Sequence, residues 1–410
     1  MLNILMVNFP AEGHVNPTIG MTQAFAARGD QVHYITTEKY KDRLEAVGAT
    51  VHLHTDLIRT ASIDSSTPAG LSAFMNIHIQ TSMDILAITK QLSESTDFDF
   101  VFYDRFGAGE LVRDYLKIPG IASSPSFLIS QNRMATNLFR SNGNEPFQLD
   151  EQATTSLHLM KERFGVAPKD MVQFMSNTGA LNVVYTSRYF QPDADSFGEE
   201  NLFIGPSFPE RKGENSFPLD ALQDKKVLYI SMGTVLDHVE DFFNTCIEAF
   251  SDFEGIVVIA AGEKADFTKI NPAPEHFIIS PYVPQLEVLR HSDVFITHGG
   301  MNSVNEGIHF NVPLVVLPQD KDQPMVAQRL TELQAGYRIT KDQINVQLLR
   351  DAVHEVMSNA AYREGVQKIN DSFQQSGGTE EALAKIDAYL KISLCKSHNY
   401  NPTKKQEPDH

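Results

Sequence analysis

The sequence of 410 residues lacks tryptophan and contains only two cysteines, Cys246 and Cys395. The two cysteines lie far apart and fit neither a metal-binding nor a redox spacing, which suits a reducing cytoplasm. The sequence also lacks a run of about 18 apolar residues, so no membrane-spanning helix is expected. Its first ten residues, MLNILMVNFP, have neither the basic segment nor the apolar length of a secretory signal peptide. We therefore expect a cytoplasmic protein.

Basic residues are scarce relative to acidic ones. The chain has 34 lysines and arginines against 52 aspartates and glutamates, a formal net charge of -18 and a pI of about 5.2. Because nucleic acids are bound through basic stripes, and none is present, this balance argues against a nucleic-acid partner. The composition, 42% hydrophobic and 21% charged, is that of a globular protein, and the length suits two domains of roughly 100–200 residues each.

What is present is an alternation of short apolar segments with helical patterns. In the first half, strands are expected at 3–9, 32–37, 50–55, 98–104 and 120–124, with helices at 16–28 and 39–47. The alternation then restarts, with strands at 226–234, 256–262, 277–280, 294–298 and 313–318 and a helix at 238–251. Nearly all-apolar strands separated by helices indicate parallel sheets covered on both faces. The sequence therefore predicts an α/β protein with two doubly wound sheets in tandem.

The domain boundary is expected within GPSFPERKGENSFPLD (205–220), a segment rich in Pro, Gly, Ser and charge. The predicted division is an N-terminal domain (1–206), a linker (207–222), a C-terminal domain (223–378), a last helix (379–394) and a polar tail (395–410). The last helix either completes the second domain or crosses back to the first. Ligands of such sheets bind at the carboxyl ends of the strands, so two facing sheets would form a cleft between the domains.

The start of one helix is unusually polar, in the segment THGGMNSVNEGIHFNVPLVVLPQDKDQ (297–323). The strand before it ends at His298, and two glycines then allow a ligand to approach the backbone closely. Asn302 and Ser303 add side-chain donors to the N–H groups of the helix start, which together suit an anion such as a pyrophosphate. Glu306, one turn further, is suited to accept hydrogen bonds from a ribose diol. A plain turn with a capping asparagine explains the glycines alone but not this combination.

A resemblance to a known superfamily rests mainly on residues 282–323, YVPQLEVLRHSDVFITHGGMNSVNEGIHFNVPLVVLPQDKDQ. They resemble the sugar-nucleotide signature of the UDP-dependent glycosyltransferases, which include plant secondary-product and bacterial macrolide enzymes. PAEGHVNPTIGMTQAFAARGDQVHYITT (10–37) is similar to the opening of bacterial macrolide-type members, and SMGT (231–234) to a turn near the donor phosphates. The resemblance covers nearly the whole chain. It implies the GT-B fold, two Rossmann-like domains facing across a cleft, with the donor bound mainly by the C-terminal domain and the acceptor by the N-terminal one.

The resemblance also implies roles for single residues around the nucleoside. Tyr282 stands where an aromatic ring stacks on the base, and Val283 offers backbone contacts to the base. Gln285 lies near the ribose, and Glu306 binds the ribose hydroxyls. The implied donor is UDP-glucose.

The resemblance assigns further residues to the diphosphate and the sugar. Those at or near the phosphates are Ser231, Gly233, Thr234, His298, Gly300, Asn302 and Ser303. Asp322 and Gln323 are expected to bind sugar hydroxyls, as in glucose-using members. No metal or other cofactor is expected, because the start of the helix takes the place of a metal ion.

The chain departs from the plant pattern at four positions. The stacking residue is Tyr282 rather than Trp. Gly299 and Met301 replace Cys and Trp, and Asn311 replaces Gly. Bacterial members commonly vary in this way, so a nucleotide-sugar donor is still expected, while the choice between uracil and thymine stays open.

His14 and Asp104 are the expected catalytic pair. His14 lies in PAEGHVNP, expected as a loop after the first strand, just ahead of Pro17, which suits a helix start. A histidine there can take a proton from an acceptor hydroxyl near neutral pH, as the family's catalytic histidine does. Asp104 ends the strand FDFVFYD, where the family has an aspartate that orients the histidine and stabilises its protonated form. The alternatives are an ordinary loop histidine and a cap for the helix GAGELVRDYLK.

The implied reaction is a single displacement that inverts the anomeric carbon, so that an α-linked donor gives a β-glycoside. The acceptor is expected to be a hydrophobic, hydroxyl-bearing molecule such as a flavonoid, another phenol, a triterpenoid or a macrolide. Eight apolar residues are expected either to line its site or to belong to the core: Phe74, Met75, Phe106, Phe127, Met134, Phe139, Met171 and Phe174.

Other functions fit parts of the same sequence. A nucleotide-sugar epimerase of the same fold would act without an acceptor, and a noncatalytic nucleotide-sugar-binding protein would not need His14 or Asp104. An NAD-dependent enzyme is disfavoured because no G-x-G-x-x-G follows the first strand.

Two further patterns are weaker. His52 and His54 share one face of a strand, but no carboxylate or cysteine completes a metal site. Asp320 and Asp322 could suggest the two carboxylates of a glycosidase, which would not need an anion site of the kind found at 298–303.

Overall fold

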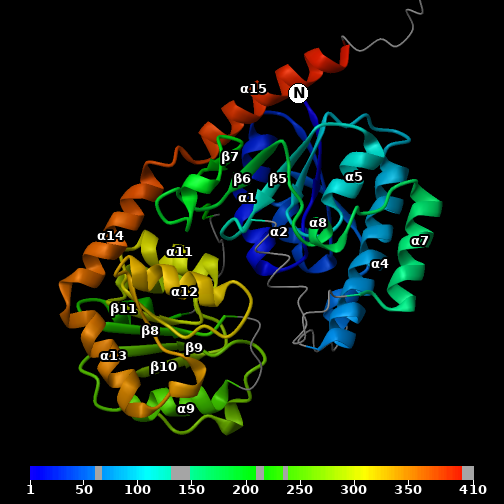
Figure 1. Ribbon diagram of the computed structural model, residues 1–410. Coiled ribbons are helices and arrows are strands. Elements are labelled where there is room, and N and C mark those ends of the chain that lie inside the picture. The colour runs from blue at the N-terminus through cyan, green and yellow to red at the C-terminus, as the bar shows by residue number, and fades with distance from the viewer. Residues whose placement is uncertain (61–66, 131–147, 209–216, 234–238, 399–410) are drawn as a thin grey trace, which may run out of the picture. The chain divides into compact units, whose positions relative to one another are not determined.

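The computed structural model describes residues 1–60, 67–130, 148–208, 217–233 and 239–398, which form two compact units (Figure 1). Unit 1 comprises Met1–Tyr185, Asp195–Pro209 and Gly377–His410. Unit 2 comprises Thr186–Ala194 and Glu210–Ser376. Each unit is an α/β structure built on one parallel sheet, as the alternation of strands and helices predicts.

Unit 1 contains a 7-stranded sheet whose neighbouring strands are all parallel, in the order β3-β2-β1-β4-β5-β6-β7. The strands are β1 (Asn3–Val7), β2 (Gln31–Thr36), β3 (Ala49–Leu53), β4 (Phe100–Asp104), β5 (Gly120–Ser124), β6 (Leu181–Val184) and β7 (Asn201–Phe203). β1 and β4 lie side by side, with Val7 opposite Tyr103. The residues that follow these two strands therefore meet at one edge of the sheet.

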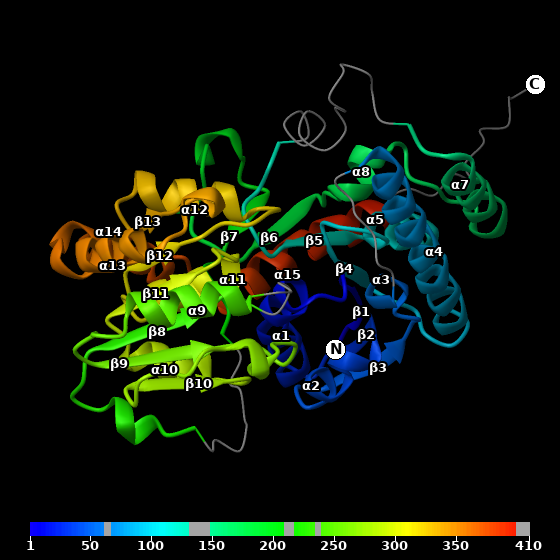
Figure 2. The same ribbon diagram turned by 90° about the horizontal axis from the view of Figure 1, so that it is seen from below.

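Helices cover both faces of this sheet (Figures 1 and 2). The helical elements described in this part of the chain are α1 (Glu12–Ala27), η1 (Glu38–Tyr40), α2 (Lys41–Glu45), α3 (Leu57–Thr60), α4 (Pro68–Leu92), α5 (Gly109–Leu116), α7 (Glu151–Phe164), α8 (Met171–Met175), η2 (Ala194–Ser196) and α15 (Gly378–His398). One face packs on α1, α2 and α15 in a core that includes Phe25 and Tyr34. The other face packs on α4, α5 and α7 in a core that includes Leu86 and Met160.

Unit 2 contains a 6-stranded parallel sheet in the order β10-β9-β8-β11-β12-β13. Its strands are β8 (Val227–Ser231), β9 (Ile256–Ala260), β10 (Phe277–Ser280), β11 (Val294–Thr297), β12 (Leu314–Val316) and β13 (Gly336–Arg338). Its helices are η3 (Leu219–Leu222), α9 (Glu240–Ala249), η4 (Phe267–Lys269), α10 (Gln285–His291), α11 (Met301–His309), α12 (Gln323–Glu332), η5 (Lys341–Gln343), α13 (Val346–Ser358) and α14 (Ala360–Gln374).

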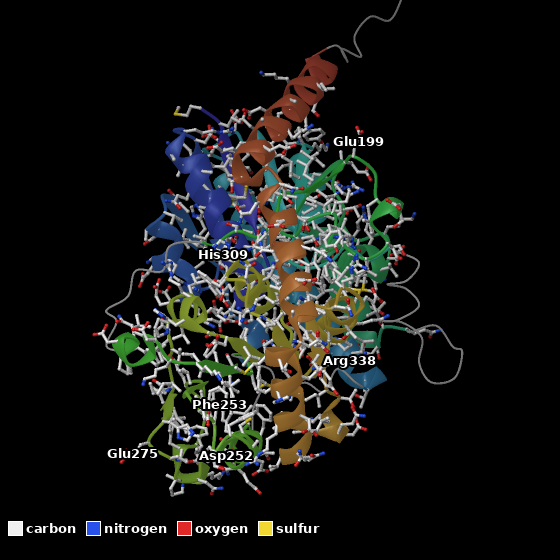
Figure 3. All side chains as sticks on the ribbon, turned by 90° about the vertical axis from the view of Figure 1, so that its left-hand side faces the viewer. Glu199, Asp252, Phe253, Glu275, His309 and Arg338 are labelled. Carbon is white, nitrogen blue, oxygen red and sulfur yellow. The ribbon has the colours of Figure 1, made fainter. Side chains whose placement is uncertain are left out.

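One face of the unit 2 sheet packs on α9 and α13. Arg350 of α13 ties the two helices together, because its Nε donates to the carbonyl of Ala249 at 2.5 Å. The same guanidinium lies 3.3 Å from a carboxylate oxygen of Asp252, which is labelled in Figure 3. Across the described residues of both units, no helix combines the length and the apolar character needed to cross a membrane.

Helix α1 begins earlier than the sequence predicts. The helix expected over 16–28 starts at Glu12, so His14 lies in its first turn rather than in a loop. The carbonyl of Ala11 accepts a hydrogen bond from the N–H of His14 at 2.9 Å, which starts the helix ahead of Pro17. Pro17 lies inside the helix, in its second turn, so its missing N–H removes one backbone hydrogen bond there.

The sequence does not predict β6, β7 or β13. These strands have only 4, 3 and 3 residues, too few to show a periodic pattern. It also gives no sign that 186–194 belongs to unit 2, where the carbonyls of Tyr189 and Phe190 accept hydrogen bonds from Arg329 of α12 at 2.8 and 3.1 Å.

Helix α15 belongs to unit 1 rather than to the unit that precedes it in the chain. Ala382, Ile386 and Leu390 lie in the same core as α1. Arg28 of α1 also pairs with Asp387 of α15 at 2.9 Å.

Ile386→Ala is expected to destabilise unit 1, because Ile386 has no exposed surface and packs in the core shared with α1. Truncating a buried isoleucine to alanine typically lowers the free energy of unfolding by about 2–5 kcal/mol. Urea unfolding measures this loss, with Lys385→Ala as the matched control, since Lys385 is an exposed neighbour on the same helix. Equal unfolding midpoints for the two variants would show that α15 does not stabilise the unit.

Candidate active site

Unit 1 has its topological switch point between β1 and β4. The sheet continues from β1 toward β2 and from β4 toward β5, and ligands of doubly wound sheets bind at the carboxyl ends of such a strand pair. His14 follows β1 in the first turn of α1, and Asp104 is the last residue of β4. The topology thus brings together two side chains that are 90 positions apart in the sequence.

His14 and Asp104 form a hydrogen-bonded pair. His14 Nδ1 lies 2.7 Å from Asp104 Oδ2, and the two side chains are 30% and 1% exposed. The other carboxylate oxygen, Oδ1, accepts a hydrogen bond from Phe106 N at 2.9 Å. A proton on Nδ1 directed at the carboxylate places the lone pair of the ring on Nε2, the state that can accept a proton. The pair has the geometry of a general base with a fixed tautomer.

Asn177 holds the loop that follows Asp104. Asn177 is 1% exposed, and its Nδ2 donates to the carbonyls of Asp104 and Gly107 at 3.2 and 2.9 Å. The next helix, α5, has Ala108 as its N-cap residue and no side-chain capping bond. Asp104 therefore does not cap α5, the alternative that the sequence left open.

An aromatic cluster adjoins the pair. The rings of Phe9 and His14 meet edge to face, with centroids 4.9 Å apart. Phe9, Phe74 and Phe106 also surround His78 of α4, at centroid distances of 5.4, 4.3 and 4.7 Å. The three phenylalanines are partly exposed. His14 therefore lies beside apolar surface of the kind that binds aromatic or aliphatic molecules.

His78 lies at the buried side of this cluster, with 2% of its surface exposed. Burial lowers the pKa of His78 to about 3, and the charge of His14 acts in the same direction. No described residue offers a hydrogen bond to Nε2 of His78. His78 is thus a neutral polar group within apolar surroundings, an arrangement that typically costs about 1–3 kcal/mol of stability.

Of the apolar residues predicted either to line the acceptor site or to belong to the core, some lie in the partly exposed aromatic cluster and others lie in the core. Phe74 and Phe106 belong to the partly exposed cluster around His78. Those buried in the core of unit 1, or partly buried against it, are Met75, Phe127, Phe174 and Met171. Two others, Met134 and Phe139, lie outside the described residues.

Unit 2 has its switch point between β8 and β11, where Ser231 pairs with Thr297. Ser231 ends β8, and Gly233 follows with a φ of +78°, a backbone conformation that glycine adopts without strain. His298 comes directly after β11. Thr234, the next residue predicted near the phosphates, lies outside the described residues.

The imidazole of His298 is held between two glycines. A Cβ added at Gly233 would lie 2.6 Å from Cε1 of this ring, and one added at Gly300 would lie 2.6 Å from Nε2. Burial lowers the pKa of His298 to about 4, although the carboxylates of Asp322 and Asp320 act in the opposite direction. His298 is therefore neutral near pH 7, with one ring N–H to offer to an anion.

Helix α11 begins next to this ring, with Gly300 as its N-cap residue. Its first turn contains Asn302 and Ser303 and no acidic residue, and neither side chain is buried. The first N–H groups of a helix have no partner within it and lie at the positive end of its dipole. The predicted anion-binding residues thus meet at one helix start, beside His298.

Glu306 and Gln285 form a second polar group on α11 and α10. Glu306 is 3% exposed, and its Oε2 accepts a hydrogen bond from Gln285 Nε2 at 2.5 Å. Gln285 Nε2 also lies 3.3 Å from Ser303 Oγ, and Gln285 Oε1 accepts from the hydroxyl of Tyr229 at 3.0 Å. Glu306, predicted to bind the ribose hydroxyls, is thus directly hydrogen-bonded to Gln285, predicted to lie near the ribose.

The residues predicted to contact the base lie just before α10. The ring of Tyr282 is 63% exposed, unusually high for a large aromatic side chain and suited to stacking on a flat ligand. Val283 is 7% exposed, so its side chain offers little surface to a ligand. Ser280 Oγ donates to the carbonyl of Tyr282 at 2.7 Å, which fixes the position of the backbone there.

Asp322 and Gln323 lie at the start of α12. Asp322 is the N-cap residue and is partly exposed. Gln323 is 8% exposed, and its Oε1 accepts hydrogen bonds from the N–H groups of Gln319 and Asp320 at 2.8 and 3.3 Å. In this structure the amide oxygen of Gln323 shapes its own loop, and Asp322 presents more surface to a sugar.

Two residues of these sites are missing from the sequence-based prediction. Tyr229 stands out in retrospect as the only polar tip within the strand VLYI, so the sequence offered a signal. Asn177 gave none, because its two carbonyl partners are 70 or more positions away.

His52, weighed as a metal ligand, pairs instead with His33 of β2 at 3.0 Å. Among the described residues, no group of three or more His, Cys, Asp or Glu could hold a metal.

Comparison with known proteins gives matches across both units. Residues 244–387 match the family described as "Erythromycin biosynthesis protein CIII-like, C-terminal domain". The chain is 63% identical over 391 residues to "Uncharacterized UDP-glucosyltransferase YdhE" of Bacillus subtilis (strain 168), which covers 95% of this chain and 99% of that protein. It is 32% identical over 402 residues to "NDP-glycosyltransferase YjiC" of the same organism, covering 95% and 98%.

Among solved structures, the chain is similar to CalG4, "the Calicheamicin Glycosyltransferase". The TM-score is 0.81 at 27% sequence identity, covering 95% of this chain and 98% of that chain. The fold is therefore GT-B, as the resemblance in the sequence implies.

Gly233→Ala is expected to weaken the binding of UDP by about tenfold or more, because the added methyl group must displace the ring of His298. The positive φ adds strain of about 1 kcal/mol. Gly262→Ala is the matched control, because Gly262 has a φ of +85° but a Cβ there meets no atom within 4 Å. Isothermal titration calorimetry measures the affinity of the two variants for UDP. Undiminished UDP affinity in Gly233→Ala would remove His298 from the binding site.

Acid is expected to destabilise unit 1 through His78. The pKa of His78 is about 3 in the folded protein and near 6.5 when unfolded, so below pH 6.5 the unfolded chain binds the extra proton. The free energy of unfolding then falls as pH falls, by about 1.4 kcal/mol per pH unit. Urea unfolding of the unmodified protein and of His78→Phe at pH 7 and pH 4.5 tests this. His78→Phe should lose less stability between the two pH values, because it lacks the imidazole that takes up the proton. An identical pH dependence in His78→Phe would contradict it.

Proposed function

We propose that this chain, which belongs to the bacterial macrolide-type family of UDP-glycosyltransferases, transfers glucose from UDP-glucose to a hydroxyl group of a hydrophobic small molecule with inversion at the anomeric carbon. Family membership makes it a glycosyltransferase that uses a nucleotide-sugar donor. The 63% identity of this chain to a protein named as a UDP-glucosyltransferase supports the choice of UDP-glucose. The observation that carries the catalytic proposal is the pair of His14 and Asp104 at the switch point of unit 1.

In the proposed reaction, Nε2 of His14 takes the proton of the acceptor hydroxyl. The acceptor oxygen forms a bond to the anomeric carbon as the bond from that carbon to the diphosphate oxygen breaks on the opposite face. An α-linked glucose thus becomes a β-glycoside, and UDP leaves with the bonding electron pair. The carboxylate of Asp104 stabilises the imidazolium that forms on His14, at the Nδ1 to Oδ2 distance of 2.7 Å.

The leaving diphosphate gains negative charge, and unit 2 offers uncharged donors to stabilise it. These are the N–H groups at the start of α11, the side chains of Asn302 and Ser303, and the ring N–H of His298. Donors already oriented by the fold stabilise developing charge without reorganisation. On this basis the proposed mechanism uses no metal ion.

The acceptor is proposed to be a hydrophobic molecule with an accessible hydroxyl group, such as a phenol or flavonoid, a triterpenoid or a macrolide. The support is the cluster of Phe9, Phe74 and Phe106, whose partly exposed rings adjoin His14. Such rings bind apolar groups through surface removed from water.

Two other functions are compatible with a nucleotide-sugar site. An epimerase would convert UDP-glucose with no acceptor present, and a binding protein would hold the donor without releasing UDP. The His14 and Asp104 pair favours transfer over both, because a buried carboxylate that orients a histidine serves proton abstraction.

His14→Ala is expected to abolish acceptor-dependent UDP release while UDP still binds, because the base lies in unit 1 and the predicted donor residues lie in unit 2. Asp104→Asn should lower kcat by about a hundredfold to ten-thousandfold, since the amide no longer fixes the tautomer of His14. The assay measures UDP release from UDP-glucose with and without a panel of phenolic and macrolide acceptors. Each reaction is run with and without EDTA, because no metal is proposed.

The same assay can also contradict the proposal. Full activity in His14→Ala would eliminate this residue as the base, and loss of all activity in EDTA would require a metal. Tight UDP-glucose binding without acceptor-dependent release from the unmodified protein, across the panel and with dTDP-glucose as an alternative donor, would favour a binding protein.

A further inference from the structure

The side chains behind Glu306 form a relay that begins at Tyr229. Tyr229 lies in the middle of β8 and is 1% exposed. Its ring stacks on Phe295 of β11, with centroids 4.8 Å apart and planes 15° from parallel. The stacked ring fixes the phenol oxygen, whose hydroxyl donates to Gln285 Oε1 at 3.0 Å. The position of the Gln285 amide therefore depends on a group that has little freedom to move.

The relay determines which way the Gln285 amide points. With Oε1 against the phenol, the NH₂ group faces Glu306 Oε2 at 2.5 Å and Ser303 Oγ at 3.3 Å. The opposite orientation would place the amide oxygen against a carboxylate, two acceptors with no proton between them. Without the phenol hydroxyl, Oε1 would lose its donor. Glu306 thus selects the orientation in which Gln285 donates to it, and the hydroxyl of Tyr229 supplies the hydrogen bond that the amide oxygen then needs.

Glu306 is buried, so its charge depends on protein or ligand donors in place of water. Gln285 occupies one direction at Oε2 and thereby fixes the plane of the carboxylate. A ribose presents two adjacent O–H donors, whereas a 2′-deoxyribose presents one. An acceptor built for a hydroxyl penalises a ligand that lacks it, because the acceptor is then left unpaired.

We infer that Tyr229 is a positioning residue that, through Gln285, holds Glu306 for a ribose diol and makes the site select a ribonucleotide such as UDP over a 2′-deoxyribonucleotide such as dTDP. The inference rests on the proposed donor site in unit 2. It concerns the pentose rather than the base, and it assigns the choice of nucleotide partly to a side chain that itself touches no ligand.

The test compares the binding of UDP, 2′-deoxy-UDP and dTDP by isothermal titration calorimetry. The unmodified protein is expected to bind UDP about 10- to 100-fold more tightly than 2′-deoxy-UDP, the range for a hydrogen bond to a charged group. Tyr229→Phe keeps the ring stacked on Phe295 and removes only the hydroxyl. It should weaken UDP binding about tenfold and leave 2′-deoxy-UDP binding nearly unchanged, so that the ratio of the two affinities falls by about tenfold.

A matched control separates the relay from a general effect of losing a hydroxyl group. Tyr337 lies on β13 of the same sheet and is partly buried, so Tyr337→Phe removes a hydroxyl away from Gln285. It should leave the ratio of affinities unchanged. Gln285→Leu should lower the ratio as Tyr229→Phe does, and the double variant should add little, because the two residues act in one chain of hydrogen bonds.

Each outcome decides the inference. An unchanged ratio in Tyr229→Phe overturns it, as does a ratio near one in the unmodified protein, which would still leave the donor site in place. Failure of the unmodified protein to bind any of the nucleotides overturns both the donor site and the inference. If Tyr229→Phe does not fold, by far-UV circular dichroism, Gln285→Leu tests the next member of the relay from a partly exposed position, and an unchanged ratio there overturns the inference as well.

Discussion

Parallel pairing of two central strands is the constraint on which both sites depend. In each sheet the chain leaves the centre in opposite directions, from β1 and β4 in unit 1 and from β8 and β11 in unit 2. Parallel strands end at the same edge, so residues that follow them meet there whatever their separation in sequence. His14 meets Asp104 in this way, and Gly233 meets His298. The polar side chains at these edges contribute chemistry, while the apolar residues of the same strands supply the core.

Both sites contain histidines that burial keeps neutral. The pKa of His298 is lowered to about 4, and that of His78 to about 3. A neutral imidazole can donate to a diphosphate without holding it as tightly as a cation would, which suits a group that must depart. The folded protein carries the cost of these buried polar groups, and the buried apolar cores of the two units offset it.

Much of this arrangement could be predicted from sequence because it follows local rules. The alternation of apolar strands and helices gives the sheets, and the dense polar pattern from His298 to Glu306 marks one ligand site. The start of α1 was predicted too late, because Pro17 looks like a first-turn residue while the carbonyl of Ala11 already starts the helix. No local sequence pattern could reveal that Asn177 holds the loop after Asp104, or that Tyr189 and Phe190 belong to unit 2. The hydrogen-bond partners of these residues lie far away in the chain.

The chain's path has a consequence for recombining such proteins. It passes between the units at four places, after residues 185, 194, 209 and 376. A chimaera joined only in the segment that follows residue 209 would leave 186–194 and α15 with the wrong parent. Arg329 would then face foreign carbonyls, and Ile386 would fill a core selected for another side chain. An exchange of donor specificity between relatives should therefore move two separate segments together, Thr186–Ala194 and Glu210–Ser376, and leave the last helix behind.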